Sequence, residues 1–403
     1  DGIRDDLVTG VQTCALPISD GGLHAADDIF VASATAGWRD LDNNQRSTQF
    51  YGAAGVAATN LLVGGAQDNG TQRLLGASLT SVMPFGGDGG QVVIDPTNTN
   101  YIYGEYVWTQ VHRSTNGGSS SSFCYGNISE ITATTANFIT PLVLDPNNAL
   151  RLYAGASSLW RTDNARAASV TWSAVKPAIG SKISAVAVAP GNSNLVWGAH
   201  NDGRVFKSLN ATAATPVWTA VDDNAALDPL PGRYVTRLAI DARDNNVVWL
   251  TFGGFASGNV RVTRDGGATW QDASGVGNRR LPDAPVNCIV VHPDDSNVVY
   301  IGTEVGVFAS DDGGQHWSAN NDGPNNAPVE QVTFEIGSRK LIAATLGRGL
   351  WTCLVQRPEL STFGTPCAGQ VLPPRIDCDP LAPARIGQTM VWTGSAQIGR
   401  AHV

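Results

Sequence analysis

A unit of about fifty residues repeats along this chain and limits the possible folds more than any other feature. Each copy begins with an apolar strand that ends near an Asp-Pro pair, and a strand rich in Tyr, Trp and Gly follows. A third strand ends in Ser/Thr-x-Asp/Asn, and an aromatic residue stands in a fourth. Four short strands per unit predict a β-propeller blade, whereas β-solenoid turns are usually shorter. The first strands are Val92–Pro96, Leu142–Pro146, Val186–Pro190, Leu238–Ala242 and Val290–Pro293, with degenerate copies at Gly55–Gly65 and Val332–Ala344.

These seven first strands predict an all-β propeller of about seven blades. The segment Asp20–Leu41 reads as the third and fourth strands of an earlier blade, which predicts a truncated N-terminal blade. No long window shows the apolar i, i+3, i+4, i+7 stripe of an amphipathic helix. No apolar run reaches about 18 residues, so we expect no membrane span in this chain.

The charge of the chain narrows the choice of partner. The formal net charge is −9 over 403 residues, and the acidic residues are spread along the sequence. Nucleic acid is excluded as an expected partner, because phosphate neutralisation needs a basic face. No His/Cys cluster has metal-ligand spacing, and acidic turns such as Asp294-Asp295 lack the alternating spacing of a calcium loop. We therefore expect no metal and no cofactor.

Both ends of the chain resemble a translated sequencing adapter. Val8–Ile18 back-translates to an indexed adapter, and residues 397–403 (QIGRAHV) correspond to the complementary adapter with its stop codon. Targeting and cloning segments must be set aside before a fold is inferred. We therefore expect residues 1–19 and 397–403 to be non-native, so that a signal peptide is not observable in this sequence.

The remaining sequence divides into a propeller and a tail. The propeller is expected over residues 20–355, followed by a linker over 356–363. Residues 364–396 resemble the beginning of a small β-sandwich domain that is cut short. The tail holds two cysteines, Cys367 and Cys378, that are predicted to form a disulfide across a short loop, which indicates an oxidising compartment.

The other native cysteines lie within the propeller region. Cys288 and Cys353 lie in predicted strands and are interpreted as buried thiols. Cys124 has no evident partner.

Two repeats carry the full pattern Ser/Thr-x-Asp-x-Gly-x-x-Trp, at Thr263–Trp270 and Ser310–Trp317, and Ser114–Ser121 carries it with Asn in place of Asp. We interpret the pattern as a structural turn and not as a set of catalytic acids. The carboxylate accepts backbone N–H groups of its own turn, glycine takes a positive φ, and the tryptophan seals the space between blades. The residues concerned are Ser114, Asn116, Thr263, Asp265, Gly267, Trp270, Ser310, Asp312, Gly314 and Trp317.

This pattern resembles the Asp-box (BNR) repeat of sialidases, sortilin-like receptors, xyloglucan hydrolases and photosystem II assembly-factor propellers. The resemblance covers nearly all of 20–355 and implies a protein that is secreted, periplasmic or held at the cell surface. Sialidases also need an arginine triad and an early Arg-Ile-Pro, but here Arg-Ile occurs only at Arg375 and Arg385, without the proline. The paired aspartates of xyloglucan hydrolases cannot be matched either. The resemblance therefore carries over no catalytic residue.

Strand order predicts which loops share a face. The loops between strands 1 and 2 and between strands 3 and 4 form a bottom face, and the 2–3 loops and the crossovers form a top face. Propellers usually bind ligands near the axis, so the polar residues of the top face are the candidates. Asp68 and Asp88 are candidate catalytic carboxylates, although the glycines around Asp88 also suit a tight crossover turn. The ligand-binding candidates are Gln67, Asp68, Asn69, Asp88, Glu105, His200, Asp202, Glu304 and Arg348.

Two functions follow from these observations. The first is an exported, monomeric module that binds a polysaccharide, another glycan or a protein. The alternative is a glycoside hydrolase, sialidase-like or xyloglucanase-like, that uses carboxylates on the top face.

Overall fold

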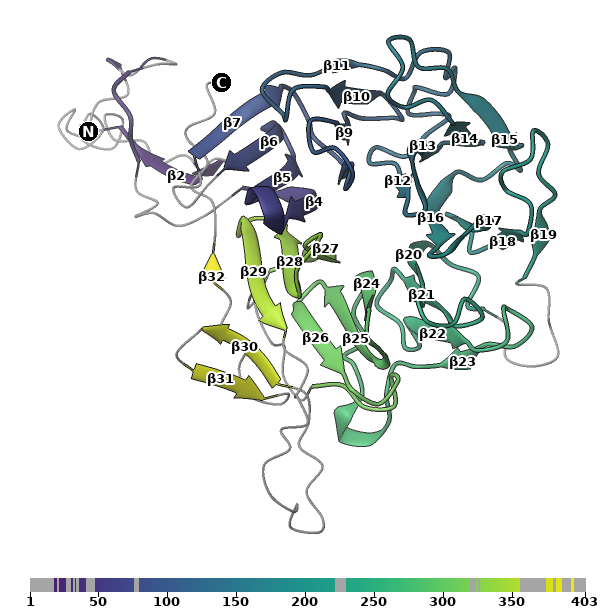
Figure 1. The fold of residues 1–403 in the computed structure, drawn as a ribbon. Helices are drawn as coiled ribbons and strands as arrows, with labels where there is room; N and C mark the ends of the chain where they lie inside the picture. Colours follow the sequence, from purple (N-terminus) through teal and green to yellow (C-terminus); the bar gives the residue numbers. More distant parts are fainter. Residues whose placement is uncertain are drawn as a thin grey trace, which may run out of the picture.

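The computed structural model confirms an all-β propeller of seven blades with almost no helix (Figure 1). Each blade is an antiparallel sheet whose strands follow chain order from the axis to the edge. The structure describes residues 18–19, 22–26, 30–31, 33, 36–40, 48–75, 80–221, 230–318, 324, 327–355, 375–379, 382–385 and 393–394.

The first four blades lie between residues 50 and 220. Blade 1 comprises β4 (Phe50–Val56), β5 (Leu61–Ala66), β6 (Gly70–Leu75) and β7 (Thr80–Phe85), with a 3-10 turn at Ala57–Thr59. Blade 2 comprises β8 (Val92–Ile94), β9 (Ile102–Glu105), β10 (Val111–Ser114) and β11 (Ser122–Phe123). Blade 3 comprises β12 (Leu142–Asp145), β13 (Asn148–Gly155), β14 (Leu159–Thr162) and β15 (Ser173–Lys176). Blade 4 comprises β16 (Ile183–Ala189), β17 (Asn192–His200), β18 (Val205–Ser208) and β19 (Thr219–Ala220).

The last three blades lie between residues 235 and 355. Blade 5 comprises β20 (Val235–Ile240), β21 (Val248–Phe252), β22 (Val260–Thr263) and β23 (Gln271–Asp272), and a 3-10 turn follows at Gly277–Arg279. The described strands of blade 6 are β24 (Val286–His292), β25 (Asp295–Thr303) and β26 (Gly306–Ser310). Blade 7 is built on β27 (Val329–Phe334), β28 (Lys340–Thr345) and β29 (Leu350–Val355).

The ring closes directly between blade 7 and blade 1. Gln49 forms a bridge with Leu346, and Val56 forms one with Ile336. Phe50 of blade 1 shares a buried cluster with residues of blade 7. Burial of the inner strands on both faces explains why each reads as a short apolar run.

The described residues of the segment Asp20–Leu41 form a sheet apart from the seven blades, which differs from the expectation of an earlier, truncated blade. Its described residues contribute β2 (Gly22–Ala25) and β3 (Arg39–Asp40), which form a separate three-stranded sheet with β1 (Ile18–Ser19). Blade 1 has four strands of its own, so the ring is complete without this segment.

Described residues of the tail extend the seventh sheet. β30 (Arg375–Asp379) pairs with β29 and with β31 (Ala382–Arg385), while β32 (Thr393–Gly394) also pairs with β29. Of the adapter-like segment 1–19, only Ile18 and Ser19 (β1) are described, and residues 397–403 and the predicted linker 356–363 lie outside the described residues.

Aromatic residues of the second strands fill the spaces between blades. Trp197, Trp249 and Tyr300 are fully buried at matching positions of β17, β21 and β25. Trp249 packs in one cluster with Ile301 and Trp317 of the next blade. Large aromatic side chains provide the apolar area that holds neighbouring blades together. Among the described residues, none of the helical segments has the length and apolar character needed to cross a membrane.

Candidate functional site

The turns that end the first strands form the bottom face, and their acidic groups are already bound. Asp95, Asp145 and Asp241 are buried, and each accepts a backbone N–H group two residues further on, at 2.8 to 2.9 Å. In blade 6 the ring nitrogen Nδ1 of His292 takes this place and accepts the Asp294 N–H group. These side chains are therefore engaged in holding their own turns.

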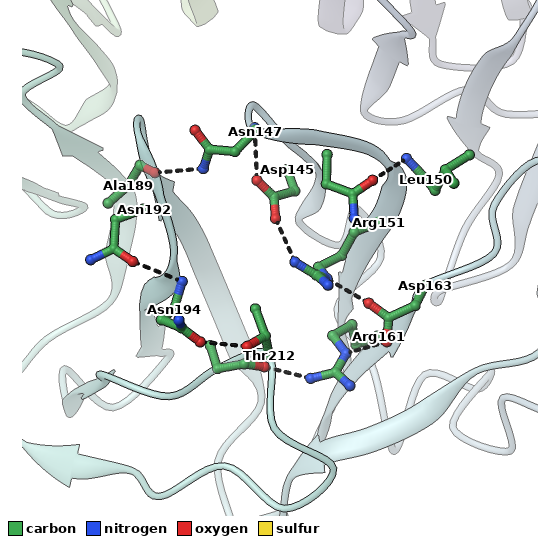
Figure 2. A network of polar contacts seen from close by, with 12 residues as sticks. Asp145, Asn147, Leu150, Arg151, Arg161, Asp163, Ala189, Asn192, Asn194 and Thr212 are labelled. Carbon is green, nitrogen blue, oxygen red and sulfur yellow. Dashed lines mark hydrogen bonds and ion pairs between the residues drawn. The ribbon is translucent and has the colours of Figure 1, made fainter.

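A polar network also joins blades 3 and 4 on this face (Figure 2). Arg151 pairs with Asp145 at 3.1 Å and with Asp163 at 2.5 Å, and Arg161 pairs with Asp163 at 2.9 Å. Asn147 donates to the carbonyl of Ala189 in the next blade at 2.9 Å. In blades 3 and 4 the charged groups of the bottom face thus bind one another, and Asn147 joins the two blades.

The Ser/Thr-x-Asp/Asn turns lie on the same face and form closed hydrogen-bond sets. The Oδ1 atom of Asp265 accepts from the Thr263 hydroxyl at 2.7 Å and from the Thr269 N–H group at 2.9 Å, while the Gly267 N–H group donates to the Thr263 hydroxyl. Although burial raises the pKa of Asp265, the hydrogen bonds from Thr269 and Thr263 outweigh it and lower the pKa to about 2. Ser310 and Asp312, and Ser114 and Asn116, make corresponding bonds.

The tryptophan after each turn binds the preceding blade. Trp317 donates its indole N–H group to the carbonyl of Ala273 at 2.9 Å, and Trp270 donates to Val221 at 3.0 Å. The indoles of Trp172 and Trp218 bond to Cys124 and Val175 in the same way. Each bond links the fourth strand region of one blade to the next, in addition to the apolar contact.

A cavity of about 410 Å³ opens on the opposite, top face at the axis of the ring. It lies where the first strands begin, and all seven blades contribute to its wall. The lining residues are Tyr51, Gln91, Asn137, Phe138, Ile139, Thr140, Pro141, Ser184, Tyr234, Thr236, Arg237, Asn287 and Glu330.

Five of the seven blades use a β-bulge to turn a side chain into this cavity. The strand register shifts between Phe50 and Gly52, and corresponding shifts occur near the beginning of β16, β20, β24 and β27. β-bulges re-aim side chains and are frequent beside active sites. The residues skipped at the five bulges are all lining residues: Tyr51, Ser184, Thr236, Asn287 and Glu330.

The electrostatic character of the cavity depends on one acid and one base. The pKa of Glu330 is raised to about 7, chiefly by burial and also by the charge of Glu304, while Arg237 acts to lower it. Arg237 donates to the side-chain oxygen of Gln91 at 3.5 Å and to the backbone carbonyl of Glu330 at 3.4 Å. Glu330 is the only carboxylate among the described residues of the wall.

Aromatic rings stand at the rim of the cavity. Tyr51 and Phe138 meet edge to face with centroids 6.4 Å apart, and Phe138 meets Trp108 in the same way at 6.3 Å. Trp108 and Thr109 both have φ in the left-handed region, which is unfavourable for bulky and β-branched residues. Phe138 and Tyr234 remain 43% and 40% exposed, so their rings are accessible to a ligand.

The top-face candidates from the sequence do not line the cavity, but some of them support its wall. Gln67 accepts a hydrogen bond from the Tyr51 hydroxyl at 2.7 Å. Glu304 accepts one from the side-chain amide of Asn287 at 3.0 Å. Gln67 and Glu304 therefore contact the residues that line the cavity and do not line it themselves.

Asp68 and Asp88 lie together, away from the cavity wall. The Asp68 N–H group donates to the Asp88 carboxylate at 3.0 Å, which joins a 2–3 loop to the crossover that follows blade 1. Asn69 donates to the backbone carbonyl of Gln67 at 2.9 Å. The glycines beside Asp88 allow close packing, because a Cβ atom on Gly89 would lie 2.4 Å from the carbonyl oxygen of Gly70. This contact is what a tight crossover turn requires.

The remaining candidates are enclosed or lie elsewhere on the rim. Glu105 is fully buried, and burial raises its pKa well above the ordinary value. His200 is also buried, which lowers its pKa to about 4, and its Nδ1 atom lies 2.9 Å from the Ser181 carbonyl. Asp202 pairs with Arg204, and Arg348 is exposed outside the cavity wall.

The cysteines differ in part from expectation. Cys288 is a buried free thiol, but Cys353, interpreted from the sequence as a thiol, is disulfide-bonded. A buried strand position suits both states, which is why the sequence did not separate them. The predicted disulfide between Cys367 and Cys378 concerns side chains outside the described residues. Within the described chain, no group of three or more His, Cys, Asp or Glu residues could hold a metal ion.

Comparison with known proteins places the chain near a solved glycoside hydrolase structure. No family model matches the chain, and no curated protein matches it. The chain is similar to the crystal structure of an ancestral GH74 enzyme, with 16% sequence identity and a TM-score of 0.46. The match covers 66% of this chain and 44% of the chain of that enzyme, so it spans less than half of the neighbour.

Proposed function

We propose that this protein is a saccharide-binding propeller whose ligand occupies the axial cavity of the top face. The observation that carries the proposal is the cavity wall, to which every blade contributes and into which five β-bulges turn a side chain. A bulge repeated at the same place in five of the seven blades is difficult to explain by packing alone, because a bulge interrupts the ladder of its sheet.

The chemistry of the wall suits sugar hydroxyl groups. The amide groups of Gln91 and Asn287 keep donors and acceptors beyond the bonds they make to Tyr51, Arg237 and Glu304, and the Ser184 hydroxyl has no partner. The Thr236 hydroxyl donates to Val286 but can still accept, whereas the amide of Asn137 is engaged by Asn201 and Ile183. Amide and hydroxyl groups can each donate and accept hydrogen bonds, and they therefore suit sugar hydroxyl groups, which also do both. Such a mixture of polar groups around a concave site fixes the orientation of a small ligand.

The rim supplies the apolar contact that sugar rings also need. The accessible rings of Phe138 and Tyr234 can pack against the C–H face of a pyranose, while the Tyr51 hydroxyl bonds to Gln67. The cavity volume of about 410 Å³ fits a ligand of small-molecule size. A protein partner would instead need roughly 800 Å² of contact on each side. Glycan recognition is therefore favoured over protein recognition.

Binding tests this proposal directly. Purified protein is screened against oligosaccharides by isothermal titration calorimetry, with Asn287→Ala and Thr236→Ala as cavity variants. We expect both variants to lose at least about tenfold in affinity, because each removes a hydrogen bond inside the cavity. Asp68→Asn, which lies outside the wall, serves as the matched control and should bind normally. If Asp68→Asn abolished binding while both cavity variants bound normally, the ligand would not occupy the axial cavity.

Glycoside hydrolysis is the second candidate function, and Glu330 favours it. A carboxyl group with a pKa of about 7 is suited to act as a general acid near neutral pH. Hydrolysis usually needs a second carboxylate facing the first, yet the nearby Glu304 is held by Asn287 behind the wall. Product formation from a panel of glycosides, abolished by Glu330→Gln in a folded protein, would support the enzyme. Binding without product would support the binding module.

Export of the protein belongs to the same proposal. The disulfide at Cys353 supports it, because disulfides persist in oxidising compartments. The resemblance of the bottom-face turns to Asp-box repeats also supports it. Cell fractionation of the full-length protein tests this, and recovery only from the reducing cytoplasm would contradict it.

A further inference from the structure

Arg237 carries a charge in the axial cavity without a charged partner. Its Nε atom is buried and has no hydrogen-bond partner. Its two terminal nitrogens bond only to neutral oxygens of Gln91 and Glu330, at 3.5 and 3.4 Å, the long end of the hydrogen-bond range. Among the described residues, no carboxylate forms an ion pair with it.

A guanidinium in this condition is unusual for physical reasons. Withdrawing a charge from water is unfavourable unless a counter-charge and hydrogen bonds replace the lost hydration. Arg151 and Arg166 show the paired arrangement, since each forms an ion pair with a buried aspartate, whereas Arg113 and Arg233, like Arg237, bond only to neutral oxygens. Arg237 also lines the cavity, so a ligand could supply the missing partner.

We propose that the axial site recognises an acidic saccharide, and that Arg237 binds the carboxylate or sulfate group of that ligand. The inference rests on the saccharide-binding function proposed above and adds the class of saccharide. A planar guanidinium donates two parallel N–H groups to an oxyanion, which neutral hydroxyl groups do not match. Gln91, Asn287 and the unpartnered Ser184 hydroxyl then remain for the hydroxyl groups of the sugar.

Other titratable groups surround the same place and set the pH dependence. Glu330 faces Arg237 from β27, Glu304 approaches from the loop after β25, Tyr234 lies just before β20, and Cys288 lies on β24. Burial raises the pKa of Glu330 to about 7, so this carboxyl is largely neutral below that pH. A neutral Glu330 does not repel an anion and can donate a hydrogen bond to it. Affinity for an acidic ligand should therefore rise as the pH falls through about 7.

The experiment compares three classes of ligand on the intact protein. Oligogalacturonates carry carboxylates, sulfated carrageenan oligosaccharides carry sulfates, and galacto-oligosaccharides are neutral. Titration calorimetry at pH 6 and pH 8 measures affinity for each class. We expect one acidic class to bind at least about tenfold more tightly than the neutral class, and more tightly at pH 6. The class that binds distinguishes a carboxylate from a sulfate.

Variants separate recognition from folding. Arg237→Gln should lose about tenfold in affinity for the acidic ligand while its thermal unfolding stays close to that of the wild type. Arg237→Lys keeps the charge without the planar fork and should show an intermediate loss. Arg243→Gln removes an exposed bottom-face arginine that donates to the carbonyl of Asp294, and it serves as the matched control.

The outcomes distinguish the two proposals. Neutral oligosaccharides that bind as tightly as acidic ones, with Arg237→Gln unchanged, would overturn the acidic specificity and leave saccharide binding intact. Binding of none of the three classes would overturn both. Acidic ligands that bind Arg237→Gln and Arg243→Gln equally well would show attraction to overall charge and would overturn the role of Arg237.

Discussion

Arg237 donates to the backbone carbonyl of Glu330 at 3.4 Å, yet the two side chains form no ion pair. The strand bulge between Val235 and Arg237 and the bulge at Glu330 present both side chains to the same cavity. An acid and a base that could neutralise each other are thus held apart at the axis of the ring. This separation is costly for the free protein, and it has measurable consequences.

Replacing Glu330 by Gln should stabilise the protein in alkali. The pKa of this carboxyl is raised from 4.5 to about 7, so the folded protein binds a proton between these pH values that the unfolded chain has released. Stability therefore falls as the pH rises through this interval, by on the order of 3 kcal/mol in total. Urea unfolding should show Glu330→Gln more stable than the wild type at pH 8 and equal to it at pH 4. Identical pH profiles for the two proteins would refute the raised pKa. Asp311→Asn, on the bottom face, is the control.

Replacing Trp317 by Phe should destabilise the contact between blades 5 and 6. The indole is fully buried, and its N–H group bonds to the Ala273 carbonyl, which the change leaves unpaired. We expect a loss of about 1–3 kcal/mol in the free energy of unfolding. Trp351→Phe removes a more exposed indole that bonds to Arg348 and should cost less than half as much. Equal losses in the free energy of unfolding would show that the hydrogen bond between the blades adds no more stability than the bond of the exposed indole.

Replacing Gly65 by Ala should disturb the contact between blades 1 and 2. A Cβ atom at this position would lie 2.0 Å from the backbone oxygen of Gly90, and the backbone cannot yield as a side chain can. We expect a loss of about 1–3 kcal/mol, measured by urea unfolding. At Gly198 the nearest atom to an added Cβ is a Trp218 ring carbon at 3.9 Å, so Gly198→Ala should be tolerated. A normal Gly65→Ala protein would mean that the two blades lie further apart.

The turn at Asp265 should weaken in acid. Hydrogen bonds from Thr269 and Thr263 lower the pKa of Asp265, an exposed residue, to about 2. Its contribution to stability is therefore present above the usual pKa of 3.8 and is lost as the pH falls towards 2. Asp265→Ala should lower Tm by about 2–4 °C at pH 7 and by less at pH 2. A Tm difference that does not change with pH would contradict this origin.

The fold could be predicted because each blade carries its own pattern. The apolar run before Asp145 and the one before Asp241 each specify a buried strand and the turn after it. Ring closure could not be predicted, because blade 7 meets blade 1 through residues such as Gln49 and Leu346 that belong to no repeated pattern. For this reason the sequence pattern of Asp20–Leu41 predicts an additional blade, whereas the described residues of this segment form a separate sheet.

The cavity could not be predicted from the sequence, because the feature that most blades share is a single residue at the same position near the beginning of the first strand. Loop residues such as Gln67 and Glu304 are polar and lie on the correct face, which makes them the candidates that the sequence predicts. In the structure they do not line the cavity but hydrogen-bond to the lining residues Tyr51 and Asn287. In a single repeat, the residues that line the cavity cannot be distinguished from other residues at the beginning of a strand. A β-bulge has no characteristic sequence pattern here that would predict it. Aligning the repeats on Val56, Asp95, Asp145, Ala189, Asp241, His292 and Glu335 reveals a shared position five residues earlier. This position is occupied by Tyr51, Gly90, Thr140, Ser184, Thr236, Asn287 and Glu330. All of these except Gly90 line the cavity.

The most direct test is a crystal structure of the protein with the oligosaccharide that binds most tightly in the calorimetric screen. We expect the sugar at the axis of the top face, within hydrogen-bond distance of Thr236 and Asn287, with its acidic group on Arg237. A ligand bound instead among the bottom-face turns near Asp265 and Asp312, with the axial cavity empty, would contradict the proposed site.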